Sequence, residues 1–367
     1  MSPNIFFMKK TFSFLFISLF ILSYSLTHHS CTKPDDNGTG SGTTTVAQDK
    51  EYINNSLAEI NNCIKTIRDA EGFQTLFNFL DLRSGDVNNE AWIEEMFDAL
   101  DDVMPTSNND NRFEYSIFRG RYVWNRTTKL FTKSASNAII IEFPSAPNVT
   151  TNNMVASFDM YEDGLYQVNS ESVYLPKKAK INVTKSGTKI AGLDLNAVYS
   201  SIGFPRPQNV LVNLFIAPNN NTIEIKEVNS KQFTVSANYG CIGSMKATVN
   251  FNNDDYDNFE IEKYLTKIDF EFKKDNFTID GSWDARTFYL FNDPNTNDIN
   301  STITCNIRNG LNKIGELKFK DVNGERRVYV FYKDGTSNDA EIHYDAFTSS
   351  LKSTLKPYFG NQVDDWF

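Results

Sequence analysis

Very few residues in this chain could act as nucleophiles, general bases or soft metal ligands. The chain has three histidines and four cysteines, and a single histidine, His343, lies beyond residue 30. A Ser-His-Asp triad needs a histidine beside its nucleophile, and zinc sites draw most of their ligands from histidine and cysteine. No G-x-S-x-G or H-E-x-x-H motif occurs in the sequence. The sequence therefore excludes most triad hydrolases and all histidine-rich metal centres.

Carboxylates are the remaining groups that could do acid–base chemistry. The chain has 46 acidic residues, and a glycosidase needs two of them about 5–10 Å apart. Aromatic rings on strands can stack on sugars, and Tyr122, Trp124 and Trp283 fall in strand-like runs. Most such rings belong to a core and keep a polar tip in water. A surface glycoside hydrolase or a glycan-processing accessory protein is therefore an alternative function, with these three aromatics as candidate ligand-facing residues.

Two runs rich in Asn and Asp are candidate cation sites. The run DPNTND (293–298) begins like a calcium-binding loop, but the glycine and the glutamate of that motif do not follow. The run NNDDYDN (252–258) is a second acidic segment. Asn and Asp commonly form solvated turns. We therefore predict turns here, with no metal centre and no cofactor, and keep a structural calcium ion as the alternative.

The N-terminal segment is predicted to be an export signal. Met8 and two lysines precede fifteen uncharged residues, 12–26, which are rich in Phe, Leu and Ile. A short basic segment followed by an apolar stretch is typical of a secretory signal, and this stretch is short for a membrane span of about 20 residues. Translation can start at Met1 or at Met8, and the sequence leaves both starts open.

Cys31 follows this segment and precedes the run TKPDDNGTGSGTTT (32–45), which has no apolar residue to pack. This arrangement resembles the signal and tether of Gram-negative bacterial lipoproteins, in which the cysteine carries acyl chains such as palmitate. Ser30 fits the pattern, whereas the two histidines before it depart from its aliphatic and small residues. The early acidic pair (35–36) is similar to signals for export to the cell surface. The resemblance implies acylation at Cys31 and anchoring in the outer membrane, on its periplasmic or cell-surface face.

The other three cysteines are Cys63, Cys241 and Cys305. They have no C-x-x-C spacing and no neighbouring histidine, so redox catalysis and zinc binding are not expected. We predict one disulfide bond, between Cys241 and Cys305, because both cysteines fall in strand-like runs and exported proteins form disulfides. Three unpaired, mostly buried thiols are the alternative.

The charge balance excludes whole classes of partner. The formal net charge is −10, and removing residues 1–30 takes away two lysines and no acidic residue. Nucleic-acid binding needs a basic patch, and the sequence contains none. Adsorption on anionic lipid needs positive charge as well. Membrane association is therefore expected through the N-terminal lipid.

Hydrophobic periodicity predicts helices first and strands afterwards. Apolar residues such as Ile53, Ile60 and Ile64 recur at helical spacing in 48–105. From residue 113 the period is two, and in KIDFEF (267–272) apolar and charged residues alternate, as in a half-buried antiparallel strand. A closing helix is expected over residues 346–360.

We therefore predict an α+β fold that is predominantly antiparallel β. N-terminal helices precede a large curved sheet or β-sandwich, and one C-terminal helix follows. This order of elements resembles half-barrel lipoprotein carriers, in which a curved sheet wraps helices and holds acyl chains. The predicted segments are a signal peptide (1–30), a lipidated tether (31–47), a helical segment (48–105), an antiparallel β-region (106–344, with two related meanders at about 112–239 and 240–344), and a C-terminal helix and tail (345–367).

The sequence favours a non-enzymatic role over catalysis. Nucleophile motifs are lacking, histidine is scarce, and the acidic residues fall mostly in alternating strand positions or Asn-rich turns. We predict a membrane-anchored lipoprotein that binds a glycan, a lipid or a protein, or has a structural role. The glycan-directed hydrolase remains the alternative, and the sequence leaves the ligand and the oligomeric state open.

Overall fold

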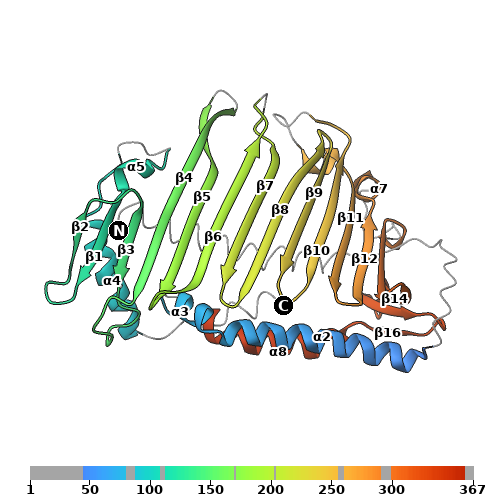
Figure 1. Ribbon diagram of the computed structural model, residues 1–367. Helices are drawn as coiled ribbons and strands as arrows, with labels where there is room; N and C mark the ends of the chain where they lie inside the picture. Colours follow the sequence, from blue (N-terminus) through green and yellow to red (C-terminus); the bar gives the residue numbers. More distant parts are fainter. Residues whose placement is uncertain are drawn as a thin grey trace.

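The computed structural model describes residues 44–79, 87–107, 112–168, 171–201, 204–254, 260–290 and 299–359. These residues form one large open β-sheet with helices along one of its sides (Figure 1). The predicted fold class is confirmed, since the chain is mostly antiparallel β, begins with helices and ends with one helix. The sheet stays open and curved and does not form a sandwich.

The sheet has sixteen strands, and they follow the alternating segments that the sequence predicts. The strands are β1 Gly120–Asn125, β2 Leu130–Ser134, β3 Ile139–Phe143, β4 Met154–Val168, β5 Glu171–Lys185, β6 Thr188–Tyr199, β7 Pro207–Ile216, β8 Asn219–Asn229, β9 Gln232–Tyr239, β10 Ser244–Phe251, β11 Leu265–Lys274, β12 Phe277–Trp283, β13 Ile303–Asn309, β14 Asn312–Val322, β15 Glu325–Tyr332 and β16 Ser337–Asp339.

The described helices are α2 Val46–Asp69, α3 Glu71–Phe79, α4 Val87–Asp101, α5 Tyr115–Phe118, α6 Ile261–Tyr264, α7 Ala285–Leu290 and α8 Glu341–Phe359, with a 3-10 turn at Ile299–Ser301. Helix α2 begins at a capping box in which Thr45 and Gln48 bond each other's backbone amides. The predicted apolar stripe of α2 is buried at Ile53, Ile60 and Ile64. Helix α8 is the predicted closing helix, and it starts a few residues earlier than expected. None of the described helices is both long and apolar enough to cross a bilayer.

From β3 to β16 the sheet is a meander in which each strand pairs with the next strand in the sequence. Every pair is antiparallel except β1 and β3, which run parallel because β2 returns on the other side of β1. The strand connections therefore alternate between two edges. The upper edge carries the β4–β5, β6–β7, β8–β9, β10–β11 and β12–β13 connections, and the lower edge carries the turns between (Figure 1).

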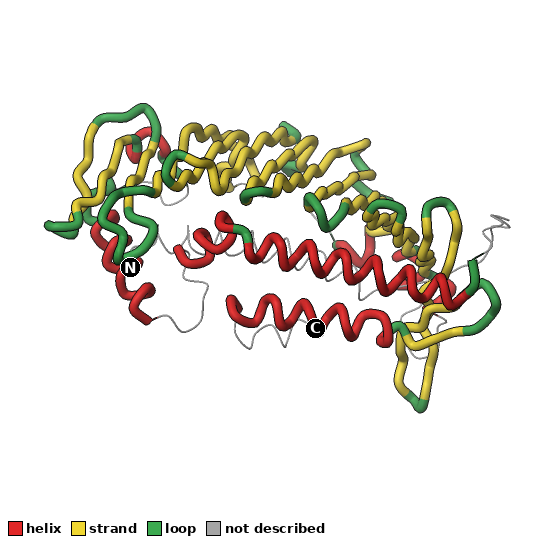
Figure 2. Tube along the Cα trace, turned by 60° about the horizontal axis from the view of Figure 1, so that its bottom comes forward, coloured by secondary structure: helices red, strands yellow, loops and turns green. Residues whose placement is uncertain are grey.

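Helices α2 and α8 lie side by side along the lower edge and cross the strand direction (Figure 1). Ile60 and Ile64 of α2 form a small core with Leu351 of α8, and the Asn61 side-chain amide donates to the Phe347 carbonyl at 3.2 Å. Figure 2 shows the sheet curving around this helix pair. The concave side of the sheet therefore faces the helices.

Two larger cores lie at the two flanks of the sheet. At the first flank α4, α5 and strands β1–β4 pack together, with Tyr122 and Phe143 almost fully buried. At the other flank Ile53 of α2 packs with Phe277, Val330 and other residues of β12–β15. Burial of these apolar side chains fixes the helices on the same side of the sheet at both ends.

Candidate functional site

Between the two flanking cores, the concave side of the sheet carries mostly apolar side chains, with Asn221 of β8 among them beside Leu214. Paired residues of neighbouring strands project to the same side, and Leu193 of β6 pairs with Leu214 of β7, while Val212 pairs with Ile223 of β8. We call this surface the apolar face. It consists of Ile181, Leu193, Leu195, Val210, Val212, Leu214, Ile223, Ile225, Val235, Ala247, Val249 and Ile268.

Every residue of the apolar face is half-buried, whereas Ala197, Phe233 and Ala237 on the same side of these strands are buried. The half-buried state contrasts with the flanks, where the equivalent positions, such as Tyr122 and Phe277, are buried against helices. The opposite side of the same strands is polar, as shown by the register pairs Asn213–Thr222 and Lys246–Glu271. The central sheet is therefore amphipathic, and its apolar side is less completely packed than a protein core.

The lower edge of the apolar face is closed by α2 and α3. Ile242, in the β9–β10 turn, packs against Ile60 and Ile64 of α2. Further along, Gly72 of α3 lies so close to the sheet that a Cβ atom there would be 2.7 Å from the carbonyl oxygen of Ile190. This close approach explains why glycine occupies the first turn of α3.

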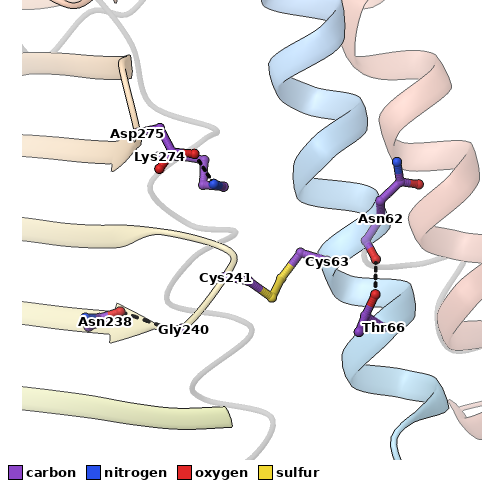
Figure 3. The surroundings of a disulfide bond; sticks show 8 residues. All are labelled: Asn62, Cys63, Thr66, Asn238, Gly240, Cys241, Lys274 and Asp275. Carbon is purple, nitrogen blue, oxygen red and sulfur yellow. Dashed lines mark hydrogen bonds and ion pairs between the residues drawn. A yellow bond between two sulfur atoms is a disulfide. The ribbon is translucent and has the colours of Figure 1, made fainter. Parts of the chain in front are cut away.

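A disulfide bond joins Cys63 of α2 to Cys241 in the β9–β10 turn (Figure 3). The two cysteines are 178 residues apart, and their Cα atoms lie 5.8 Å apart. The bond fixes the helix layer to the middle of the lower edge, next to Ile242, which packs on the small core of α2 and α8.

The predicted Cys241–Cys305 disulfide bond is wrong, because Cys305 is a free, buried cysteine of β13. Strand β13 lies three strands away from β10, which corresponds to about 14 Å at the usual strand spacing. A disulfide needs Cα atoms closer than about 7 Å. The sequence showed that both cysteines follow strand-like patterns, but it did not show how many strands separate them.

A polar cluster holds α2 and α8 at the far end of the lower edge. His343 of α8 bonds the Tyr332 hydroxyl through Nε2 and the Asn54 side-chain oxygen through Nδ1, each at 2.7 Å. Lys333 pairs with the buried Asp49 carboxylate at 3.0 Å. A neutral His343 that donates from Nδ1 and accepts at Nε2 satisfies both hydrogen bonds.

Burial shapes the titration of this cluster. Desolvation lowers the pKa of His343, and the positive charge of Lys50 lowers it further. Desolvation, together with the Asp49 carboxylate, raises the pKa of Tyr332 to about 12. Both groups are therefore neutral near pH 7, and both nitrogens of His343 are engaged in structural hydrogen bonds.

The prediction that three aromatic side chains face a ligand is wrong for two of them. Tyr122 is fully buried and its hydroxyl donates to the Phe118 carbonyl at 2.8 Å, while Trp124 is 5% exposed. Both belong to the first flanking core, since α4 and α5 cover strands β1–β4. Trp283 is half-buried and pairs with Ile268, so it borders the apolar face at the upper edge.

Several other predictions lie partly or wholly outside the described residues. Cys31 and the segment 293–298 are outside them, and the segment 252–258 is described only up to residue 254. Across the described ranges no three His, Cys, Asp or Glu side chains come together as metal ligands. Lipidation at Cys31 and a structural calcium ion at either acidic segment therefore stay predictions.

The resemblance to half-barrel carriers implies a curved sheet that holds acyl chains, but the sequence does not identify the residues of the apolar face. Its signal was present in runs such as VLVNLFIA (210–217), but only the pairing of seven neighbouring strands, β5 to β11, joins these runs into one surface. Chemically, this surface can hold an apolar ligand by burial and offers no group for covalent catalysis. No protein-family model, curated protein or solved structure matches the chain. The interpretation of the site therefore rests on its geometry.

Proposed function

We propose that this protein is a lipoprotein, acylated at Cys31 and anchored in the outer membrane, that binds an apolar ligand without catalysis. The half-buried apolar face of β5–β11 carries this proposal. A soluble domain normally covers so large an apolar surface, or uses it for binding. Of the ligand classes that the sequence leaves open, a lipid fits an apolar surface best.

The compartment is supported by the disulfide bond between Cys63 and Cys241. Structural disulfides form and persist in oxidising environments, such as the bacterial periplasm and the cell surface. The bond is therefore consistent with export, which the N-terminal signal predicts independently.

Binding is favoured over glycoside hydrolysis by the chemistry at hand. A hydrolase of this kind needs a carboxylic acid with a raised pKa beside exposed aromatic rings. Tyr122 and Trp124, which the hydrolase interpretation needs at the surface, are core residues. The hydrolase interpretation therefore loses two of its three candidate sugar-stacking rings.

The proposed binding role is tested by cross-linking a photoreactive fatty acid to the full-length protein in phosphatidylcholine vesicles. We expect cross-links that map by mass spectrometry to β5–β11. Val212→Glu should reduce them at least about tenfold, since a buried charge is unfavourable, and the uncharged variant Val212→Thr should reduce them less. Asn213→Glu, on the same strand but the opposite side, is the matched control. Equal labelling of Val212→Glu and Asn213→Glu, or labelling elsewhere, would contradict the proposal.

A further inference from the structure

Large apolar side chains are exposed along the upper edge of the sheet. They lie at the ends of strands or in the connections there, from β4 across to the loop before β11. Their exposed fractions are 54% for Leu165, 53% for Val198, 36% for Phe204, 53% for Val228 and 55% for Ile261. Single exposed apolar residues are ordinary, but these five share one edge of one sheet.

The two edges of the apolar face differ in what covers them. Helices α2, α3 and α8 run along the lower edge (Figure 1), and the flanks are closed by the two larger cores. At the upper edge the described helices are the short α5, beside β3 and β4, and the short α6 and α7, beside β10–β12 (Figure 1). On the apolar side β8 ends at Glu227, which pairs with Phe233, while Val198 pairs with Asn209 and so projects to the polar side. The exposed apolar residues of the upper edge therefore border the end of the apolar face.

Two ion pairs are described on the upper edge. Arg206 pairs with Glu227 at 3.1 Å, and Lys263 pairs with Glu260 at 3.5 Å. Such pairs leave little local net charge, and the whole chain carries a formal charge of −10. An electrically neutral lipid surface is therefore a better partner for this edge than an anionic one.

We propose that the upper edge docks on a phospholipid bilayer, so that a lipid moves between the bilayer and the apolar face without crossing water. Exposed apolar side chains at this edge enter the interfacial region of the bilayer, as the apolar side chains of interfacial proteins do. This inference rests on the proposed ligand-binding role and adds the surface through which the ligand enters.

The tether permits this orientation. Helix α2 starts on the lower edge, and its first residue, Val46, packs near β14. Strand β7 has 10 residues, so this part of the sheet is about 33 Å tall. The fourteen residue steps from Cys31 to Thr45 span at most about 50 Å when extended. The upper edge can therefore reach the same bilayer in which the acyl chains are anchored.

Photocross-linking tests the docking surface. The full-length protein is placed on phosphatidylcholine vesicles that contain radiolabelled phospholipid, with p-benzoylphenylalanine replacing Val228 or, as a control, Leu311. Leu311 is 95% exposed in the β13–β14 turn at the lower edge. We expect phospholipid cross-links from position 228 at least about five times those from position 311, as only the upper edge enters the interface. Equal labelling, or stronger labelling at position 311, would overturn the proposal.

A loading experiment separates this proposal from the binding role itself. The photoreactive fatty acid is offered in donor vesicles, and its appearance on the protein is followed over time. The triple variant Leu165→Asp, Val198→Asp, Val228→Asp should load about tenfold more slowly and reach the wild-type level at equilibrium, because the loss of apolar contact affects docking. Leu311→Asp should load at the wild-type rate. Wild-type loading by the triple variant refutes the docking edge, whereas an unlabelled wild-type protein refutes the binding role.

Discussion

The Cys63–Cys241 disulfide bond should make one of the largest single contributions to the stability of this protein. It closes a loop between residues 178 positions apart, and the chain-entropy relation gives about 5 kcal/mol for a loop of that length. Measured effects of removing native disulfides are about 2–5 kcal/mol, which is a large part of the 5–15 kcal/mol that stabilises a typical domain. We therefore expect the double variant Cys63→Ala, Cys241→Ser to unfold at a clearly lower urea concentration.

The assay compares urea unfolding of the wild-type protein, oxidised and reduced, with that of the double variant. Reduction of the wild type should lower the midpoint by nearly as much as the double substitution. Cys305→Ala is the control, because Cys305 is free and buried in β13, and its oxidised form should remain sensitive to reduction. If Cys305→Ala loses this sensitivity, or if the double variant unfolds within about 1 kcal/mol of the wild type, the assigned pairing or the loop argument is wrong.

Two further predictions concern pH and the anchor. The pKa of His343 is lowered in the folded state by burial, so below the ordinary value of 6.5 the unfolded state binds more protons than the folded state. The free energy of unfolding should therefore fall as the pH drops below that value. Urea unfolding should show this loss of stability between pH 7.5 and pH 5 in the wild type, and a smaller loss in His343→Gln. Cys31→Ala should lose radiolabelled palmitate completely in cells, whereas Cys305→Ala should keep it; label that persists in Cys31→Ala would show that the lipid is attached elsewhere.

The elements of the fold could be predicted because each depends on local patterns. The helical stripe at Ile53, Ile60 and Ile64 and the alternation in 267–272 both survive in the structure as α2 and β11. The shape of the sheet could not be predicted in the same way. Alternation shows that a strand has an apolar side, but whether a second layer covers that side depends on where the helices pack.

The candidate site was harder to predict because burial is a property of tertiary neighbours. Tyr122 and Val212 both sit in strands with alternating or apolar patterns, yet α4 and α5 bury Tyr122, whereas Val212 stays half-buried. The prediction of the disulfide bond failed for the same reason, because its true partners, Cys63 on a helix and Cys241 in a turn, meet only in the tertiary structure. A disulfide bond between two strand-like runs needs neighbouring strands, and the sequence does not show the strand order.

The position of the disulfide bond bears on the proposed role of the apolar face. At one flank α2 is held by apolar packing, for example by Ile53 against Phe277. In the middle of the lower edge, its Ile60 and Ile64 pack on Ile242 of the β9–β10 turn. Packing of that kind further along the strands would fill the apolar face with helix side chains and leave no surface for a ligand. A covalent bond from Cys63 to a turn at the lower edge holds the helix there without filling the face. Stability and an accessible apolar surface are therefore compatible in this fold, because they depend on different residues.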